Sequence, residues 1–215
     1  MVWDSSYQQA VSVWGEKPDL LLLDLAPLLP KGRVLDLGMG EGRNVLFFAA
    51  QGYDVRGIDL SPTAVQKCLE RAQILNVTVQ AEVQDIREVV IEPNSLALVI
   101  CAMSLQFMKY ADSAAMLHQI KAGLQPDGFV YLTVFSTEDP SYERLKQTGT
   151  PAERGTFFSQ RLNDHIHFFE QEELMLPMEG LKLHRFSQTV MLDHGHPGVP
   201  EPHYHGILTY IGQRA

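Results

Sequence analysis

The sequence predicts a single α/β domain with a parallel β-sheet that is covered by helices on both faces. Apolar stretches typical of buried strands alternate with segments of helical period from about residue 33 to residue 135. A turn that contains Gly38, Gly40 and Gly42 stands between the first strand and the first helix of this series. Ligands of such sheets bind at the carboxyl ends of the strands, so we expect a site at this edge.

Composition narrows the possible classes of protein. The 215 residues, of which 45% are hydrophobic and 20% charged, are typical of a globular protein, and we expect one domain over 1–215. A net charge of -9 argues against a nucleic-acid partner. The sequence has no apolar run of about 18 residues and no secretory signal, which predicts a cytoplasmic protein without a membrane partner. Cys68 and Cys101 form neither a metal-type spacing nor a disulfide framework.

The N-terminal segment, 1–30, is predicted to form one or two helices that cover the domain. It carries Trp3, Tyr7 and Trp14 ahead of an apolar run at 20–23. Two interpretations of these aromatic residues remain open. They roof a ligand site, or they pack the first helix onto the core, where aromatic burial is strongly stabilising.

Five strands and three helices are expected in the central region. Apolar and alternating runs predict the strands at 34–37, 54–60, 77–83, 96–102 and 129–135. The first helix begins near Arg43 and ends at Gly52, and the second begins at Ser61-Pro62, a cap followed by a first-turn proline. The third has Asp112 as its expected N-cap and ends before the turn Gln125-Pro126-Asp127-Gly128. Cys68 lies on the apolar face of the second helix and is expected in the core.

The alternation breaks after residue 135. Residues 136–160 are polar and rich in Glu, Arg, Gly and Pro, and we interpret 136–170 as an insertion that covers the active site. An irregular surface loop is the alternative. A short strand at 165–169, a helix at 171–178 and two final strands at 182–192 and 205–213 are expected to follow.

The acidic residues around the glycine turn indicate which cofactor it binds. A dinucleotide fingerprint would place its third glycine at position 43, which is Arg. Asp36 ends the first strand, where a carboxylate repels a pyrophosphate and attracts a cationic group. Asp59 ends the second strand, where an acid can hold ribose hydroxyls, and Asp85 follows the third, where it can accept from an adenine amino group. The turn is therefore predicted to bind a cationic adenosine cofactor.

Two stretches carry a resemblance to a known family. Val-Leu-Asp-Leu-Gly-Met-Gly-Glu-Gly-Arg-Asn at 34–44 and Gly-Tyr-Asp-Val-Arg-Gly-Ile-Asp-Leu-Ser at 52–61 resemble the first motifs of class I S-adenosylmethionine-dependent methyltransferases. Within that superfamily, Gly-Arg-Asn, Gly-Tyr-Asp-Val and the Trp3-Asp4-x-x-Tyr7 start are similar to the tellurite-resistance and thiopurine-type small-molecule branch. Met39 and Asp127 depart from the family pattern, but neither replaces a glycine that approaches the cofactor.

The resemblance implies a three-layer, Rossmann-like doubly wound sheet of seven strands, mostly parallel, with the last strand at 205–213 antiparallel. It implies S-adenosyl-L-methionine as cofactor, with Asp36 near its amino end, Asp59 on its ribose and Cys101 beside its methyl region. Arg43 and Asn44 would steady the loop or the cofactor carboxylate. The implied cofactor-binding residues are Asp36, Gly38, Gly40, Arg43, Asn44, Asp59, Leu60, Asp85, Ile86 and Cys101.

The acceptor is less well determined than the donor. The fourth strand ends in Cys-Ala-Met-Ser-Leu at 101–105, unlike the Asn/Asp-Pro-Pro-Tyr type of amine- and adenine-methylating members, so we expect another small-molecule acceptor. Arg154 and Arg161 are candidates for holding an anionic one. Six histidines crowd the C-terminal third, at 165, 167, 194, 196, 203 and 205. They are solvated loop residues, substrate or proton-handling residues, or metal ligands.

We choose His203 and His205 as the catalytic base or anion contact because they enter the last strand. We predict no metal ligand, since no carboxylate stands at a ligand spacing from the histidines. The predicted function is transfer of a methyl group from S-adenosylmethionine to a small acceptor, such as a tellurium or selenium oxyanion or a thiol. An NAD-linked oxidoreductase and a non-catalytic cofactor- or metal-binding protein are the alternatives, and the sequence indicates no oligomeric state.

Overall fold

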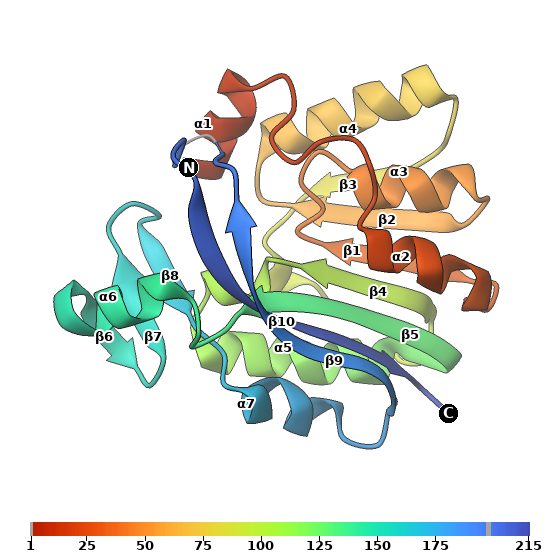
Figure 1. The fold of residues 1–215 in the computed structure, drawn as a ribbon. Helices are drawn as coiled ribbons and strands as arrows, with labels where there is room; N and C mark the ends of the chain where they lie inside the picture. The colour runs from red at the N-terminus through yellow and green to blue at the C-terminus, as the bar shows by residue number, and fades with distance from the viewer. Residues whose placement is uncertain (1, 197–198) are drawn as a thin grey trace.

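The computed structural model describes residues 2–196 and 199–215, and its main sheet has seven strands in the order β3-β2-β1-β4-β5-β10-β9 (Figure 1). The strands β1 to β5 pair in parallel, whereas β10 lies between β5 and β9 and runs antiparallel to both. The predicted fold class is therefore confirmed. The strands are β1 (Arg33–Leu37), β2 (Asp54–Asp59), β3 (Gln80–Val83), β4 (Leu96–Ala102), β5 (Leu124–Phe135), β9 (Lys182–Asp193) and β10 (His203–Gln213).

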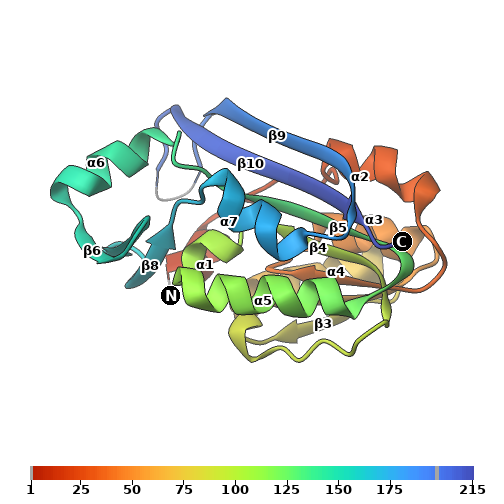
Figure 2. The same cartoon turned by 90° about the horizontal axis from the view of Figure 1, so that it is seen from below.

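Helices cover both faces of the sheet (Figures 1 and 2). One face packs against α2, α3 and α4, in a core that includes Leu22, Phe48 and Cys68. The other packs against α5 and α7, in a core that includes Leu117 and Leu174. The helices are α1 (Val2–Gln9), α2 (Leu20–Leu25), α3 (Arg43–Ala50), α4 (Pro62–Leu75), α5 (Tyr110–Gly123), α6 (Pro140–Thr148) and α7 (Gln171–Met175).

Local sequence explains why the helices next to the site begin where they do. The Ser61 hydroxyl accepts a 3.1 Å hydrogen bond from the Ala64 N–H, and Pro62 is the first residue of α4. Gly42, with φ of 83°, turns the chain from β1 into α3. The first residues of both helices thus stand at the carboxyl edge of the sheet, as the sequence predicts.

The predicted start of α5 is wrong. Lys109, not Asp112, is the N-cap residue, and Asp112 lies in the first turn of the helix. The helix ends at Gly123, ahead of residues 125–128 as predicted, but these residues, expected as a turn, already belong to β5. The N–H of Asp127 donates to the Arg214 carbonyl at 3.0 Å, so the C-terminal end of the chain extends the pairing of β5.

The segment 136–170 is ordered. It contains α6 and a separate three-stranded antiparallel sheet of β6 (Thr150–Glu153), β7 (Thr156–Ser159) and β8 (Asp164–His167). The strand expected at 165–169 therefore belongs largely to this small sheet. Phe135, Phe157 and Phe168 form an aromatic cluster that joins the small sheet to the end of β5.

Within the described ranges, none of the helices combines the length and the apolar character that a bilayer crossing requires. Cys68 and Cys101 are both free and buried, and Cys68 lies in the core as predicted.

Candidate active site

A cavity of about 810 Å³ opens at the carboxyl ends of β1, β2 and β4. Its wall includes the glycine turn after β1, the segments that follow β2, β3 and β4, aromatic residues of the N-terminal segment, the segment 136–170, and the ends of β9 and β10 that meet there. Segments far apart in the sequence thus share one wall, and the cavity is large enough for a nucleotide cofactor together with a small second ligand.

The glycine turn has a conformation that side chains would prevent. Gly38 has φ of 82°, and a Cβ there would stand 2.0 Å from the Ser104 hydroxyl oxygen. The N–H groups of Gly38 and Met39 both donate to the Ile58 carbonyl, at 2.8 and 2.9 Å, which holds the turn against β2. Gly38 and Gly40 line the cavity as predicted.

Asp59 fastens the turn from the neighbouring strand. Its carboxylate accepts a 2.8 Å hydrogen bond from the Gly40 N–H and a 2.9 Å bond from the Ser61 N–H. Burial raises the pKa of Asp59, and the two backbone donors oppose that shift. Asp59 and the adjoining Leu60 both line the cavity, so the acid keeps free lone pairs on the side where ribose hydroxyls would bind.

Asp36 is placed differently from the prediction. Its side chain is fully buried behind the glycine turn and is not among the described residues that line the cavity. Neither carboxylate oxygen has a hydrogen-bond partner in the described ranges. Burial raises its pKa to about 7, and the nearby Arg43 charge offsets only part of this shift. Asp36 therefore lies where it can influence a bound cofactor through the glycine turn, and not by direct contact in the cavity.

Arg43 and Asn44 join the turn to the N-terminal segment. The Asn44 side-chain oxygen accepts a 3.0 Å hydrogen bond from the Asp19 N–H, and the Arg43 guanidinium lies 3.6 Å from the Asp19 carboxylate. Both residues also line the cavity. Their contacts with Asp19 steady the loop, which is one of the two roles predicted for them; the other was to hold the cofactor carboxylate.

Sequence reasoning missed a second anchor, Glu41. This buried carboxylate pairs with the Lys67 ammonium at 3.1 Å and accepts from the Val13 N–H at 2.8 Å. Its position inside the glycine turn, next to an apolar helix, is the only signal that the sequence offers.

Asp85 and Ile86, predicted to lie at the adenine, both line the cavity. The Asp85 carboxylate accepts from the Arg87 N–H at 2.9 Å and pairs with the Arg87 guanidinium, whose hydrogen bonds lower the pKa of Asp85. The prediction for Cys101 needs correction. Its side chain is fully buried in the core on the α5 side, and the next residues, Ala102 and Met103, line the cavity instead. Side chains alternate between the two faces of a strand, so neighbouring residues such as Cys101 and Ala102 point in different directions.

The N-terminal aromatic residues both roof the cavity and pack. Trp3, Tyr7 and Trp14 all line it. The Trp14 indole N–H donates to the Tyr7 hydroxyl at 3.1 Å, and Tyr7 is itself buried. A Cβ at Gly40 would stand 2.9 Å from that hydroxyl, so the roof lies directly on the glycine turn.

The segment 136–170 brings positive charge to the cavity. Arg161, one of the two predicted arginines, lines it together with Arg144, which sequence reasoning missed. Burial lowers the pKa of Arg161, and the Arg144 charge lowers it further, so the two guanidinium groups lie close enough to repel. Arg154 is not at the cavity: it is an exposed residue paired with Glu170 at 2.6 Å. No sequence pattern distinguishes Arg144 from the other surface arginines.

Gln106 is a further residue that the sequence does not reveal. It lines the cavity, is fully buried, and neither atom of its amide has a hydrogen-bond partner in the part of the chain that the structure describes. An unpaired buried amide costs free energy, so its retention in the wall points to a ligand that pairs with it.

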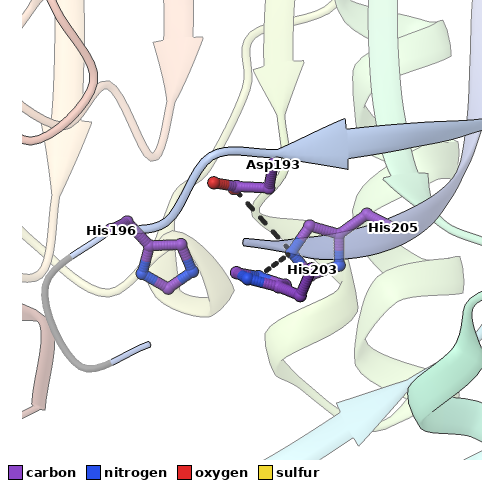
Figure 3. Close-up of side chains that lie close together, drawn as sticks. All are labelled: Asp193, His196, His203 and His205. Carbon is purple, nitrogen blue, oxygen red and sulfur yellow. Dashed lines mark hydrogen bonds and ion pairs between the residues drawn. The ribbon is translucent and has the colours of Figure 1, made fainter. Parts of the chain in front are cut away.

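The C-terminal histidines separate into two groups. His196, His203 and His205 line the cavity and converge with Asp193 (Figure 3). His165 and His167 lie in β8 instead, where the buried His167 ring bonds to Thr156 at 2.7 Å. Pro197 and Gly198, which stand between His196 and His203 in the sequence, lie outside the described residues.

The site of His203 and His205 includes two carboxylates. The Nε2 atoms of the two rings are 2.9 Å apart, and His205 Nδ1 lies 2.8 Å from the buried Asp139 carboxylate. Asp193 Oδ2 lies 3.9 Å from His205 Nε2. The sequence-based argument against metal ligands, which relied on the lack of a nearby carboxylate, is therefore wrong. Sheet pairing brings His203 opposite Asp193, and the cover supplies Asp139.

Comparison with known proteins agrees with this geometry. Residues 34–128 match the model of a methyltransferase domain. The carboxy-S-adenosyl-L-methionine synthase of Klebsiella pneumoniae (strain 342) is 33% identical over 117 residues, which cover 51% of this chain and 47% of that protein. The chain spans about half, or less, of the length of the first curated relatives that it matches.

Two solved structures share the fold over nearly the whole chain. TehB from Haemophilus influenzae superposes with a TM-score of 0.72 at 17% identity, covering 92% of this chain and 63% of that one. Magnesium protoporphyrin IX methyltransferase from Synechocystis PCC 6803, solved with bound SAH, gives 0.64 at 16% identity, covering 100% of this chain and 84% of that one.

The glycine turn, the Asp59 anchor and the antiparallel β10 all fit an adenosine cofactor at the carboxyl edge of the sheet. The matched domain and the cavity agree with the motifs at 34–44 and 52–61. Residues 34–128 therefore match a methyltransferase domain, the whole chain has the fold of the solved magnesium protoporphyrin IX methyltransferase, and the site fits S-adenosyl-L-methionine as cofactor.

Proposed function

We propose that this protein transfers the methyl group of S-adenosylmethionine to a small, soft or anionic acceptor, such as a thiol or a tellurium or selenium oxyanion. One observation carries the proposal. The cavity that contains the glycine turn and Asp59 is also lined by Arg144, Arg161 and three histidines, whose part of the wall we take as the acceptor end. A cationic donor suits the turn with its acid, and an anionic acceptor suits the arginines and histidines.

The two arginines support an anionic acceptor. Both residues line the same cavity, and burial together with the Arg144 charge lowers the pKa of Arg161. No ion pair joins Arg144 to a carboxylate within the described residues, whereas most other arginines have one. An anion bound between them would relieve the repulsion, and guanidinium groups suit oxyanions because they donate from a planar fork.

The walls favour methyl transfer by limiting water. When bound, the cofactor supplies an electrophilic methyl group on a positively charged sulfur. Met39, Phe107 and Phe135 give the cavity an apolar surface beside the charged ends. Such surroundings favour the dispersed charge of the transition state over the concentrated charges of the ground state, and holding the acceptor in line supplies much of the rate.

His203 and His205 are the proposed proton-handling residues. Asp139 holds the Nδ1 side of His205, so the Nε2 side faces His203 and the cavity. The pair can take a proton from a thiol acceptor and keep the resulting positive charge beside the thiolate. An acceptor that is already an anion has no proton to lose, so the histidine pair would contribute only its positive charge.

The covering role of 1–30 and of 136–170 is part of the proposal. Trp3, Tyr7 and Trp14 from the first segment, and Ser141, Arg144 and Arg161 from the second, belong to the cavity wall. Both segments lie outside the matched methyltransferase domain at 34–128. Segments added to a shared fold are the parts in which members of a family differ in acceptor specificity.

An acceptor screen tests the proposal. Purified protein and S-adenosylmethionine are incubated with thiols, selenite and tellurite, and S-adenosylhomocysteine release is measured. Turnover with at least one soft or anionic acceptor is expected, together with calorimetric binding of S-adenosylhomocysteine. Binding without turnover by any acceptor would favour a non-catalytic protein, and stronger thermal stabilisation by NAD would favour an oxidoreductase.

A further inference from the structure

Four side chains at the acceptor end of the cavity are arranged as metal ligands. One carboxylate oxygen of Asp193 and one ring nitrogen from each of His196, His203 and His205 lie within 4.8 Å of one another. Figure 3 shows the four side chains grouped where β9 ends and β10 begins. We propose that they bind a divalent transition-metal ion, zinc by the nature of the ligands, and that this ion holds the methyl acceptor. The acceptor role rests on the proposed function, whereas metal binding does not.

The hydrogen bonds of the two paired histidines leave both Nε2 atoms available as ligands. His203 Nδ1 lies 2.8 Å from the Glu201 carbonyl, which only accepts, so that nitrogen carries the hydrogen. His205 Nδ1 lies 2.8 Å from the Asp139 carboxylate and donates to it in the same way. In neutral rings, both Nε2 atoms then carry lone pairs.

These two lone pairs face each other across 2.9 Å. Such an approach is repulsive unless a positive species lies between or beside the nitrogens. A proton on one ring satisfies it, and so does a metal ion bound by both. The geometry of His203 and His205 is therefore that of a cation site.

The surrounding groups hold the ligands in place. The Asp139 carboxylate is buried and accepts from the Ser141 N–H at 2.8 Å and the Gly206 N–H at 3.1 Å, in addition to its bond with His205. One oxygen of Asp193 accepts from the Gly195 N–H at 2.7 Å, which leaves Oδ2 directed at His205 Nε2 from 3.9 Å. A carboxylate behind a metal-bound histidine is a recurrent arrangement that fixes the ring and strengthens the ligand.

Aromatic rings pack against the ligands from the cavity side. The Phe135 ring stacks on His205 with centroids 4.6 Å apart, and the Trp14 ring lies 5.3 Å from His196. His196 is also fixed by its backbone, which pairs with Val199. The four ligands thus come from four positions at the ends of β9 and β10 and in the segment between them, and each is held by a separate contact.

The ligand set selects the metal. Three imidazole nitrogens and one carboxylate oxygen suit Zn²⁺, while Mg²⁺ and Ca²⁺ prefer oxygen ligands. Zinc bonds of about 2.0–2.1 Å place tetrahedral ligand atoms roughly 3.3–3.4 Å apart. The observed 2.9 Å and 3.9 Å separations lie on either side of that value, so small side-chain adjustments complete the site.

The position of the ion gives it a role. All four ligands line the cavity that also contains the glycine turn, so an acceptor entering the cavity can add to the coordination of the metal. With zinc on their Nε2 atoms, His203 and His205 act as ligands and no longer take the proton. A thiol bound to the ion loses its proton to solvent and becomes a thiolate. The thiolate electron pair forms the new sulfur–methyl bond, and the sulfonium–methyl bond breaks with its electrons remaining on the cofactor sulfur.

Zinc titration of the full-length protein after removal of metal by EDTA tests the site. We expect one ion per chain by calorimetry and elemental analysis, and a tetrahedral absorption spectrum when Co²⁺ replaces Zn²⁺. His203→Gln with His205→Gln should abolish uptake, and Asp139→Asn should weaken it about 10- to 100-fold because the ligand ring loses its support. His184→Gln, in β9 but bonded to Gln213, is the matched control and should bind zinc like the wild type.

The outcomes are separable. Absence of zinc and cobalt uptake by the wild type, or full uptake by the double histidine variant, would overturn the site. S-adenosylhomocysteine binding by each variant shows that it is folded and does not depend on the metal. If zinc binds but turnover with a thiol is equal with and without it, the acceptor role is wrong. If zinc binds and no acceptor is methylated, the proposed function fails while the metal site stands.

Discussion

The Gly40 N–H and the Asp59 carboxylate are joined by a 2.8 Å hydrogen bond that crosses from the glycine turn to the end of β2. The bond fixes the glycine turn, and Asp59 also lines the cavity, where its remaining lone pairs would be available to the ribose of the proposed cofactor. Loop geometry and cofactor affinity should therefore change together when Asp59 is altered.

Replacement of Asp59 by Ala should weaken S-adenosylhomocysteine binding roughly 10- to 100-fold, because hydrogen bonds to a charged group contribute about 1.5–3 kcal/mol. Isothermal titration calorimetry measures the change. Asp54→Ala, at the exposed start of the same strand, should leave affinity unchanged. Equal affinities for wild type and Asp59→Ala would contradict the assignment.

Gly38 and Gly52 offer a matched pair for testing the crowding at the turn. Both have φ near +82°, but a Cβ at Gly38 meets Ser104 at 2.0 Å, whereas a Cβ at Gly52 meets nothing within 4 Å. Gly52→Ala should lower the free energy of unfolding by about 1–2 kcal/mol, from the left-handed conformation alone. Gly38→Ala should lower the free energy of unfolding, measured in urea, by clearly more than Gly52→Ala does, and it should abolish cofactor binding. Similar losses in the two variants would show that space at the turn is not limiting.

Asp36 should make the stability of the ligand-free protein depend on pH. Its folded pKa of about 7 exceeds the unfolded value of about 3.9, so the folded state binds the proton more tightly. The resulting stabilisation is complete below about pH 4 and is lost as pH rises through 7. Relative to Asp36→Asn, the wild type should therefore lose free energy of unfolding between about pH 5 and pH 8 in urea titrations. A difference that stays constant over this range would rule out the titration of Asp36.

Arg144→Ala should raise the KM for an anionic acceptor about tenfold or more while S-adenosylhomocysteine affinity stays the same, because Arg144 lines the acceptor end of the cavity. Steady-state kinetics with a working acceptor from the screen measure this. Arg154→Ala is the control, since that exposed residue pairs with Glu170. A loss confined to cofactor affinity would place Arg144 at the wrong end of the site.

Gln106→Leu should increase stability and reduce activity. An unpaired buried amide costs about 1–3 kcal/mol, which an apolar side chain of similar size avoids. The melting temperature of the ligand-free variant should rise, while kcat/KM falls because a ligand contact is lost. A variant of unchanged activity would mean that Gln106 does not meet a ligand.

Local pattern allowed much of the cofactor half to be predicted. The glycines at 38 and 40, Asp59, Asp85 and the Ser61-Pro62 helix start lie within a few residues of strand ends, where parallel topology brings them together without further information. Errors arose where a tertiary contact overrides local preference. β5 begins earlier than the expected turn because it pairs with the end of the chain at Arg214, and the side chain of Cys101 points into the core because of strand alternation.

By itself, the sequence predicted the fold class, the cofactor and most of the residues at the strand ends that line the cavity, because these depend on short-range spacing and strand periodicity. Only the tertiary structure decided the acceptor end. Asp139, Arg144, Asp193 and His205 come from a cover segment and from two strands that pair antiparallel, at sequence separations without a recognisable spacing. The contact of Asp139 with His205 depends on how the cover packs against β10, and the approach of Asp193 to His205 depends on the pairing of β9 with β10. Both are properties of the packed chain rather than of any short stretch of it.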